Sequence, residues 1–187
     1  MTTVIGLDLS LTNTGIARIT WNGDSPINDV VADIQRVQST GKLTDTWPTR
    51  AERLQRLTHT IATQVHAARL VVIEGPAFNA KSLSSHDRSW LWGKVYDAAA
   101  LNAEQVLVVP PASVKKWATN NGSADKDDMV LTAARMWPML DGIKNDTADA
   151  LALAGIGMQL LGGPCPFPLY SYRTAVVDKL RAELEVA

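Results

Sequence analysis

The sequence predicts an α/β domain built on a mixed five-stranded sheet flanked by helices. Its first part holds three strand-like apolar runs separated by short turns, the pattern of an antiparallel meander. Two further short apolar runs alternate with long helical segments, which is typical of parallel strands joined by right-handed crossovers. The chain has 187 residues, of which 46% are apolar and 20% charged, so it suits one ordinary globular domain.

The first half of the chain contributes four predicted strands and one predicted helix. The strands span 4–9, 15–21, 30–37 and 70–74, and the helix spans 49–68. Short turns separate the first three strands, at 10–14 and at Asn22-Gly23-Asp24. In the helix, apolar residues recur on one face, at Leu54, Leu57, Ile61 and Val65. The fourth strand is an apolar run closed by Gly75-Pro76, as expected of a buried strand.

The second half is predicted to be mainly helical. Helices are expected at 84–103, 113–119, 124–136 and 145–154, with a fifth strand at 106–109. The segment 145–154 is rich in Ala and Leu and lacks Gly and Pro, so it predicts a closely packed helix with Asn145 as its N-cap. A Pro-rich turn at 162–168 precedes an amphipathic terminal helix. We expect residues 1–161 to form the body of the domain and 162–187 to be part of it.

Composition excludes several classes of protein. The single cysteine, Cys165, excludes an internal disulfide and a cysteine-based metal site. No apolar run approaches the roughly 18 residues of a membrane span, and the first residues lack a signal-peptide pattern. We therefore expect a cytoplasmic protein. The net charge of −1 gives no overall attraction to nucleic acid, so DNA binding would depend on a local basic patch.

Four acidic residues lie where the predicted elements would bring them together. Asp8 is near the end of the first strand and Glu74 closes the fourth, so parallel pairing would place both at the carboxyl edge of the sheet. Asp146 and Asp149 are three residues apart and project from one face of what we expect to be the first turn of a helix. One interpretation is that these two acids only stabilise the helix start. If the helix packs across the sheet, they would join Asp8 and Glu74 instead.

Four carboxylates at one point would indicate a metal site. They would repel one another and raise one another's pKa values unless a cation compensated them. Oxygen ligands without a His or Cys cluster favour Mg²⁺ or Mn²⁺ over zinc. Such a site suits two-metal phosphodiester hydrolysis, in which ions about 3.5–4 Å apart activate water and stabilise the leaving oxygen.

Four motifs give the chain a resemblance to a known family. They are Ile5-Gly6-Leu7-Asp8 with Thr14-Gly15, Ile73-Glu74, Gly122-Ser123-Ala124-Asp125-Lys126 and Asp146-Thr147-Ala148-Asp149-Ala150-Leu151. Found in order and at matching spacing between about residues 1 and 158, they resemble the RuvC family of Holliday junction resolvases, in the RNase H-like superfamily. The resemblance implies an RNase H-like nuclease fold. It also implies a homodimer that binds four-way DNA junctions and cuts two strands symmetrically with Mg²⁺.

The resemblance also implies roles for particular residues. The family's four catalytic and metal-binding acids map onto Asp8, Glu74, Asp146 and Asp149. Its two functional loop lysines map onto Lys115 and Lys126, and its aromatic residue near the junction centre maps onto Phe78, one residue further on than usual. From their positions, Lys116, Lys81 and Arg88 are further candidates for contact with DNA phosphates. Asp8-Leu9-Ser10 stands where the family usually has Asp-Pro-Gly, and 79–86 also differs, which would suit a phage-encoded member.

Other interpretations remain open for several features. Arg50, Arg53 and Arg56 share a helix face that either contacts DNA or is simply solvated. Trp90 and Trp92 crowd the helix 84–103, either as core residues or as part of a two-fold interface.

Three other functions are compatible with parts of the sequence pattern. An actin-like ATPase or sugar kinase would need a second lobe and a second Gly-rich loop, which we do not find in 187 residues. A non-catalytic junction-binding protein would not need all four acids. A broader nuclease acting on forks, flaps or RNA–DNA hybrids stays as an alternative.

Overall fold

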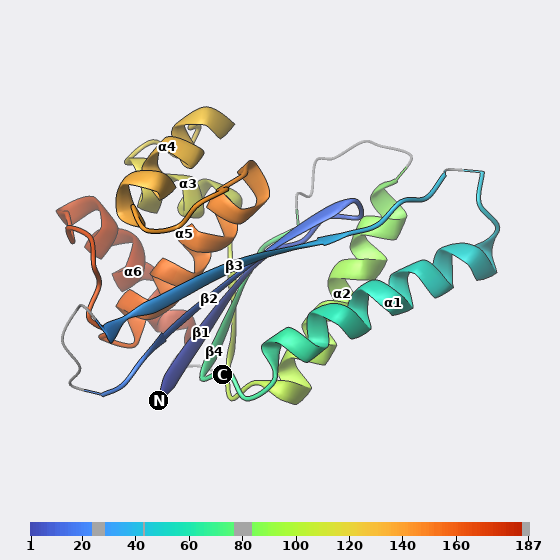
Figure 1. Cartoon of the computed structure of the whole chain (residues 1–187), viewed down its shortest axis with the longest axis horizontal. Coiled ribbons are helices and arrows are strands. Elements are labelled where there is room, and N and C mark those ends of the chain that lie inside the picture. The colour runs from blue at the N-terminus through green and yellow to red at the C-terminus, as the bar shows by residue number, and fades with distance from the viewer. Residues whose placement is uncertain (24–28, 43, 77–83, 185–187) are drawn as a thin grey trace.

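The computed structural model describes residues 1–23, 29–42, 44–76 and 84–184, without the side chain of Glu183. A five-stranded sheet in the order β3-β2-β1-β4-β5 runs through its centre (Figure 1). Three strands form an antiparallel meander: β1 (Thr2–Asp8), β2 (Asn13–Trp21) and β3 (Val31–Gln38). The other two, β4 (Leu70–Glu74) and β5 (Val106–Val109), extend the sheet in parallel from β1. The predicted mixed sheet is confirmed.

Helices cover both faces of this sheet (Figure 1). On one face lie α1 (Trp47–Val65) and α2 (Ser85–Asn102). On the other lie α3 (Pro111–Thr119), α4 (Lys126–Met136), α5 (Asn145–Leu160) and α6 (Ser171–Leu184). Among the described residues, no helix is long and apolar enough to cross a membrane.

Each face of the sheet has its own hydrophobic core, because successive strand residues point to opposite faces. In β1, Val4 belongs to the core beneath α3–α6, whereas Ile5 and Leu7 belong to the core beneath α1 and α2. The predicted apolar face of α1 is fully buried in that second core, through Leu54, Leu57, Ile61 and Val65. A sheet buried on both faces explains why its central strands read as continuous apolar runs.

The helix α5 is buried almost all round and begins differently from the prediction. Asn145 was predicted to be its N-cap, but the N-cap is Lys144. The side chain of Thr147 accepts a hydrogen bond from the Lys144 amide at 2.8 Å and donates one to the Lys144 carbonyl at 3.0 Å. Because the helix starts there, only Asp146 of the two predicted acids lies in the first turn, and Asp149 follows it. The helix also runs to Leu160, beyond the predicted end.

The terminal helix α6 packs against α3, α5 and β5. Its Arg173 is only 3% exposed and donates hydrogen bonds to the carbonyl oxygens of Trp117, Ala118 and Pro168. The guanidinium also lies over the ring of Trp117 at 5.0 Å. Since Trp117 and Ala118 belong to the last turn of α3, the arginine joins α6 to that turn.

Candidate active site

The ends of β1 and β4 lie side by side at one edge of the sheet. Leu7 of β1 is in parallel register with Ile73 of β4, so Asp8 and Glu74 follow at neighbouring positions. Both side chains are half-buried. The structure therefore places these two acids together as the parallel pairing predicted.

The helix α5 reaches the same edge because two strand glycines allow a very close approach. A Cβ atom at Gly6 would lie 2.0 Å from the carbonyl oxygen of Ala150. A Cβ atom at Gly15 would lie 2.0 Å from the carbonyl oxygen of Asp146. Since Gly15 pairs with Asp8 across β1 and β2, this contact brings the start of α5 next to Asp8. Glycine inside a strand is a sequence signal for such a close approach, but it does not name the element that approaches.

The four acids lie within electrostatic reach of one another. Burial first, then repulsion from Glu74, raises the pKa of Asp8 to about 8. Asp149 and Asp146 add to this rise and Lys126 opposes it. Burial and repulsion from Asp149 raise the pKa of Glu74 to about 7, and burial with a smaller effect of Asp146 raises the pKa of Asp149 to about 6. A cation placed among these carboxylates would relieve the repulsion.

Two of the predicted lysines act on these acids. Lys115 of α3 is half-buried and lowers the pKa values of Glu74 and Asp149. Lys126 is exposed and lowers the pKa values of Asp8 and Asp149. The helix α4 starts at Lys126, two residues later than predicted, because Asp125 caps it by accepting the Asp128 amide at 2.9 Å. Lys126 thereby sits at the helix start, beside the acids.

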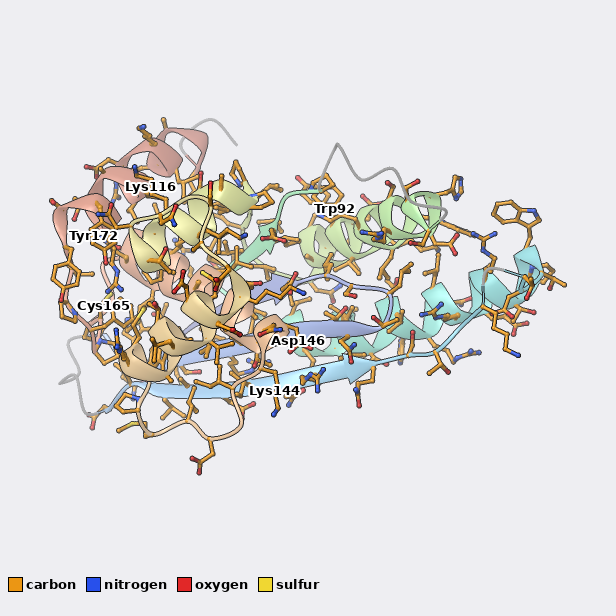
Figure 2. The ribbon with its side chains drawn as sticks, turned by 90° about the horizontal axis from the view of Figure 1, so that it is seen from above. Trp92, Lys116, Lys144, Asp146, Cys165 and Tyr172 are labelled. Carbon is orange, nitrogen blue, oxygen red and sulfur yellow. The ribbon has the colours of Figure 1, made fainter. Side chains whose placement is uncertain are left out.

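A groove of about 820 Å³ opens over the acids. Its lining includes three of the acids, one of the lysines and two polar residues of β2 and β3: Asp8, Asp146, Asp149, Lys126, Asn13 and Arg36. Figure 2 shows Asp146 near the middle of the molecule, with Lys144 beside it. A groove with so many charges is suited to a polar, charged ligand.

Arg36 is a site residue that the sequence analysis missed. Its Nε donates to Oδ2 of Asp146 at 2.7 Å, and its Nη2 donates to Oδ1 of Asn13 at 3.0 Å. Cross-strand pairing sets Arg36 opposite Gly15, the residue on which the start of α5 rests. A lone arginine in an edge strand carries no sequence signal for this role, because the pairing depends on the register of β2 and β3.

The donor set fits a hard divalent cation. Asp8, Glu74, Asp146 and Asp149 supply only carboxylate oxygens, the ligands that Mg²⁺ and Mn²⁺ prefer. Within the described parts of the chain, no three acidic, histidine or cysteine side chains are grouped so as to hold a metal ion. The carboxylate of Asp146 is paired with Arg36. For Asp146 to bind an ion together with the other three acids, its carboxylate would have to share or leave this ion pair.

Comparison with known proteins identifies the family of this chain. The model of the family "Crossover junction endodeoxyribonuclease RuvC" matches residues 4–156. The chain belongs to the RuvC family. The RuvC proteins of Rhodococcus jostii and Corynebacterium efficiens are each 27% identical to it over 154 residues. This match covers 81% of the chain in both cases, with 78% of the first relative and 66% of the second.

Solved RuvC structures share the fold. That of Thermus thermophilus RuvC has a TM-score of 0.65 at 20% identity, over 86% of this chain and 97% of that one. The same protein in complex with a Holliday junction substrate has a TM-score of 0.66 at 21% identity, over 82% and 91% of the two chains. The RNase H-like fold expected from the resemblance is confirmed. The match to the family ends before α6, so that helix lies outside it.

Four further residues are predicted from the sequence to contact DNA: Phe78, Lys81, Arg88 and Lys116. Phe78 and Lys81 lie outside the described residues. Arg88 of α2 donates to Oγ of Ser84 at 3.2 Å and lines a second cavity, of about 180 Å³, together with Glu74 and Trp92. Lys116 is exposed and lines a different cavity from that of the acids.

The arginines of α1 are largely engaged within the protein. Arg50 makes two hydrogen bonds to the carboxylate of Asp87, at 2.8 and 2.7 Å. Arg53 donates to Oγ of Ser39 at 2.8 Å and to the carbonyl of Leu11. Only the third member of the predicted face, Arg56, is strongly exposed, at 72%. Arg50 and Arg53 are thus held by hydrogen bonds within the protein, and Arg56 forms an exposed ion pair with Glu52 at 4.0 Å.

Proposed function

We propose that this chain is a metal-dependent, structure-specific endonuclease that cleaves four-way DNA junctions by phosphodiester hydrolysis. The observation that carries the proposal is the gathering of four carboxylates at one sheet edge, where three of them line a charged groove together with Lys126. Membership of the RuvC family makes the reaction that of a crossover junction endodeoxyribonuclease. The relative from Thermus thermophilus is described in complex with a Holliday junction, which is the substrate we propose here.

The four acids would hold Mg²⁺, with Mn²⁺ able to replace it. When bound, the metal supplies an activated water and stabilises charge on the leaving oxygen. Four carboxylates provide enough oxygen ligands for two ions in each site, which is the number we propose. The raised pKa values mean that Asp8 and Glu74 must release their protons to become ligands.

The lysines have a separate task. Lys115 and Lys126 approach the acids from α3 and α4, and they bring positive charge close to the carboxylates. A cation beside the scissile phosphate stabilises the charge that builds up on its oxygens during attack. We assign both lysines this role, and we assign Lys116 to contacts with the DNA backbone.

A four-way junction has two strands to cut, so we propose that the active form is a homodimer with two sites. The candidate interface is α2, whose Trp90 and Trp92 are half-buried and whose Tyr96 is exposed and stacked on Trp92. Aromatic side chains of this kind are enriched in protein interfaces. Sedimentation of the wild type and of Trp90→Glu tests this part: a fall from dimer to monomer supports it, and an unchanged mass contradicts it.

The activity is tested by offering a synthetic four-way junction, a fork, a linear duplex and an RNA–DNA hybrid, first with Mg²⁺ and then with EDTA. Paired, symmetric cuts in the junction alone, lost with EDTA, are the expected result. Equal cutting of forks or hybrids would instead indicate a broader nuclease with the same site. Binding of the junction without any cut in Mg²⁺ or Mn²⁺ would contradict the proposed activity.

A further inference from the structure

Arg36 lies in the proposed catalytic groove but has no part in the role given to the acids and lysines above. Its guanidinium forms an ion pair with Asp146, with 2.7 Å between Nε and Oδ2. The side chain of Arg36 is 36% exposed, whereas that of Asp146 is 11% exposed. Both side chains line the groove, and the arginine is the more exposed partner of the pair.

The position of Arg36 is fixed by its own strand neighbourhood. Oδ1 of Asn13 accepts from Nη2 of Arg36 at 3.0 Å and from Nε2 of Gln38 at 2.9 Å. Asn13 pairs with Gln38 across β2 and β3, so these contacts follow from the sheet register. Nε and one Nη2 hydrogen are thus used, and a guanidinium has five N–H donors in all. The donors left over can serve a second anion in the groove.

This pairing opposes metal binding at Asp146. The guanidinium neutralises a carboxylate that a divalent ion would otherwise use as a ligand. The ion must therefore share the carboxylate with Arg36 or displace the guanidinium from it. A phosphate is an equally good partner for an arginine, because its oxygens match the same planar fork. DNA entering the groove would therefore offer Arg36 a new partner at the point where Asp146 is needed.

We propose that Arg36 changes partners during substrate binding: it holds Asp146 in the free protein and moves to a DNA phosphate in the complex, which frees Asp146 for the metal ion. Arg36 therefore positions Asp146 in the free protein and contacts a DNA phosphate in the complex. This inference rests on the proposed function. By thermodynamic linkage, junction and metal each strengthen the binding of the other, and part of that coupling passes through Arg36.

The first test measures metal binding without DNA. Mn²⁺ is titrated into the wild type and into Arg36→Gln by calorimetry, with the bound ion followed by electron paramagnetic resonance. We expect Arg36→Gln to bind Mn²⁺ about three- to tenfold more tightly, because Asp146 no longer has a competing cation. The control is Arg69→Gln, which removes the same charge from the exposed pair of Arg69 and Glu104 and should leave Mn²⁺ binding unchanged. Equal or weaker binding by Arg36→Gln would overturn the proposal.

The second test measures junction binding in EDTA over a range of salt concentrations. Arg36→Gln should bind about three- to tenfold more weakly than the wild type, and the slope of log affinity against log salt should fall by about 1. Arg36→Lys keeps the charge and should recover most of the affinity. If Arg36 only braced the strands, Arg36→Lys would behave like Arg36→Gln and the salt slope would not change, which would overturn the proposal.

Failure of the proposed function and failure of the exchange of partners by Arg36 give different results. If the wild type neither binds nor cuts the junction, the proposed function fails, while the Mn²⁺ titration still reports on Arg36 and Asp146. If the wild type cuts the junction and Arg36→Gln matches it in both titrations, only the exchange of partners is wrong. Thermal unfolding of each variant shows whether the fold is kept, and Asn13→Ala provides a second way to loosen Arg36 without changing its charge.

Discussion

The indole Nε1 of Trp92 donates a 2.9 Å hydrogen bond to the backbone carbonyl of Glu74. This bond ties α2 to the residue that ends β4 and carries one of the four acids. Trp92 is therefore more than a core or interface residue, the two interpretations offered by its sequence position. The backbone of Glu74 is held from one side by this bond and from the other by β5, through the Gly75 amide and the Val109 carbonyl at 2.8 Å.

We expect Trp92→Phe to lower the free energy of unfolding by about 1 kcal/mol and the cleavage rate by about tenfold, because it leaves the Glu74 carbonyl without this donor. Thermal unfolding and single-turnover junction cleavage measure the two effects. Trp47→Phe is the control, since Trp47 lies on α1, is exposed and contacts His86. A loss of cleavage in Trp47→Phe equal to that in Trp92→Phe would contradict a specific role of the bond.

Asp146→Asn should reduce the cleavage rate by more than about 100-fold, because losing a direct metal ligand should lower the rate more than losing a group that only orients such a ligand. Junction binding in EDTA should not weaken, because the amide keeps the size of the side chain and Arg36 loses its anionic partner. Gel-shift and cleavage assays measure both effects. Asp178→Asn, on the exposed face of α6, should match the wild type in both assays. Cutting at wild-type speed by Asp146→Asn would refute the assignment of this acid.

The acids should make the metal-free protein less stable as pH rises. Their pKa values are raised in the folded state, so it binds more protons than the unfolded chain, and the free energy of unfolding falls with increasing pH. For Asp8 the fall extends from the ordinary value of 3.8 to about 8, and for Glu74 from 4.5 to about 7. Thermal unfolding in EDTA between these limits tests the direction. Asp8→Asn should flatten the dependence and raise the melting temperature at pH 8, and an unchanged slope would contradict this.

Mg²⁺ should reverse the destabilisation most strongly at high pH. Metal ligands must be deprotonated, so the apparent affinity for Mg²⁺ should increase as pH rises past about 6, where Asp149 loses its proton, and on to about 8. Calorimetric Mg²⁺ titrations in buffers of different ionisation enthalpy count the protons released. An affinity independent of pH over this range would show that these carboxyls do not bind the ion.

Lys115 and Lys116 are adjacent in sequence but should behave differently. Lys115→Gln should lower the rate of cleavage at saturating protein by about 10–100-fold, because Lys115 acts on Glu74 and Asp149. Lys116→Gln should mainly weaken junction binding at moderate salt, because Lys116 is exposed and lines another cavity. Single-turnover rates and anisotropy titrations separate the two effects. Equal losses of rate in both variants would contradict the distinction.

Gly15→Ala should destabilise the protein by about 1–3 kcal/mol, because its Cβ would lie 2.0 Å from the Asp146 carbonyl oxygen. The shift of α5 needed to relieve this clash should also lower cleavage. Chemical denaturation and the junction assay measure both effects. Gly23→Ala is the matched control, because no atom of the described residues, its chain neighbours aside, lies within 4 Å of its added Cβ. A stable, fully active Gly15→Ala would show that α5 need not approach β2 so closely.

Local sequence patterns were sufficient to predict the fold class and the family. Strand and helix periodicity predicted the meander, the parallel strands and the buried face of α1, because burial on a regular element imposes a fixed spacing of apolar residues. The motifs around Asp8, Glu74 and Asp146 resembled those of the RuvC family, and the family match over residues 4–156 agrees. These are local patterns, and they can be read without knowing which elements touch.

How those residues meet depends on packing between segments that are distant in the sequence. The helix α5 has its N-cap at Lys144, and not at Asn145, because of the hydrogen bonds between Thr147 and Lys144. The sequence does not reveal this, because several neighbouring polar residues could have made similar bonds. The ion pair of Arg36 and Asp146 joins residues 110 positions apart. It forms because the register of β2 and β3 sets Arg36 opposite Gly15, and because Gly15 lets the start of α5 pack closely against β2. Contacts of this kind arise from packing between distant segments, which leaves no periodic signal in the chain.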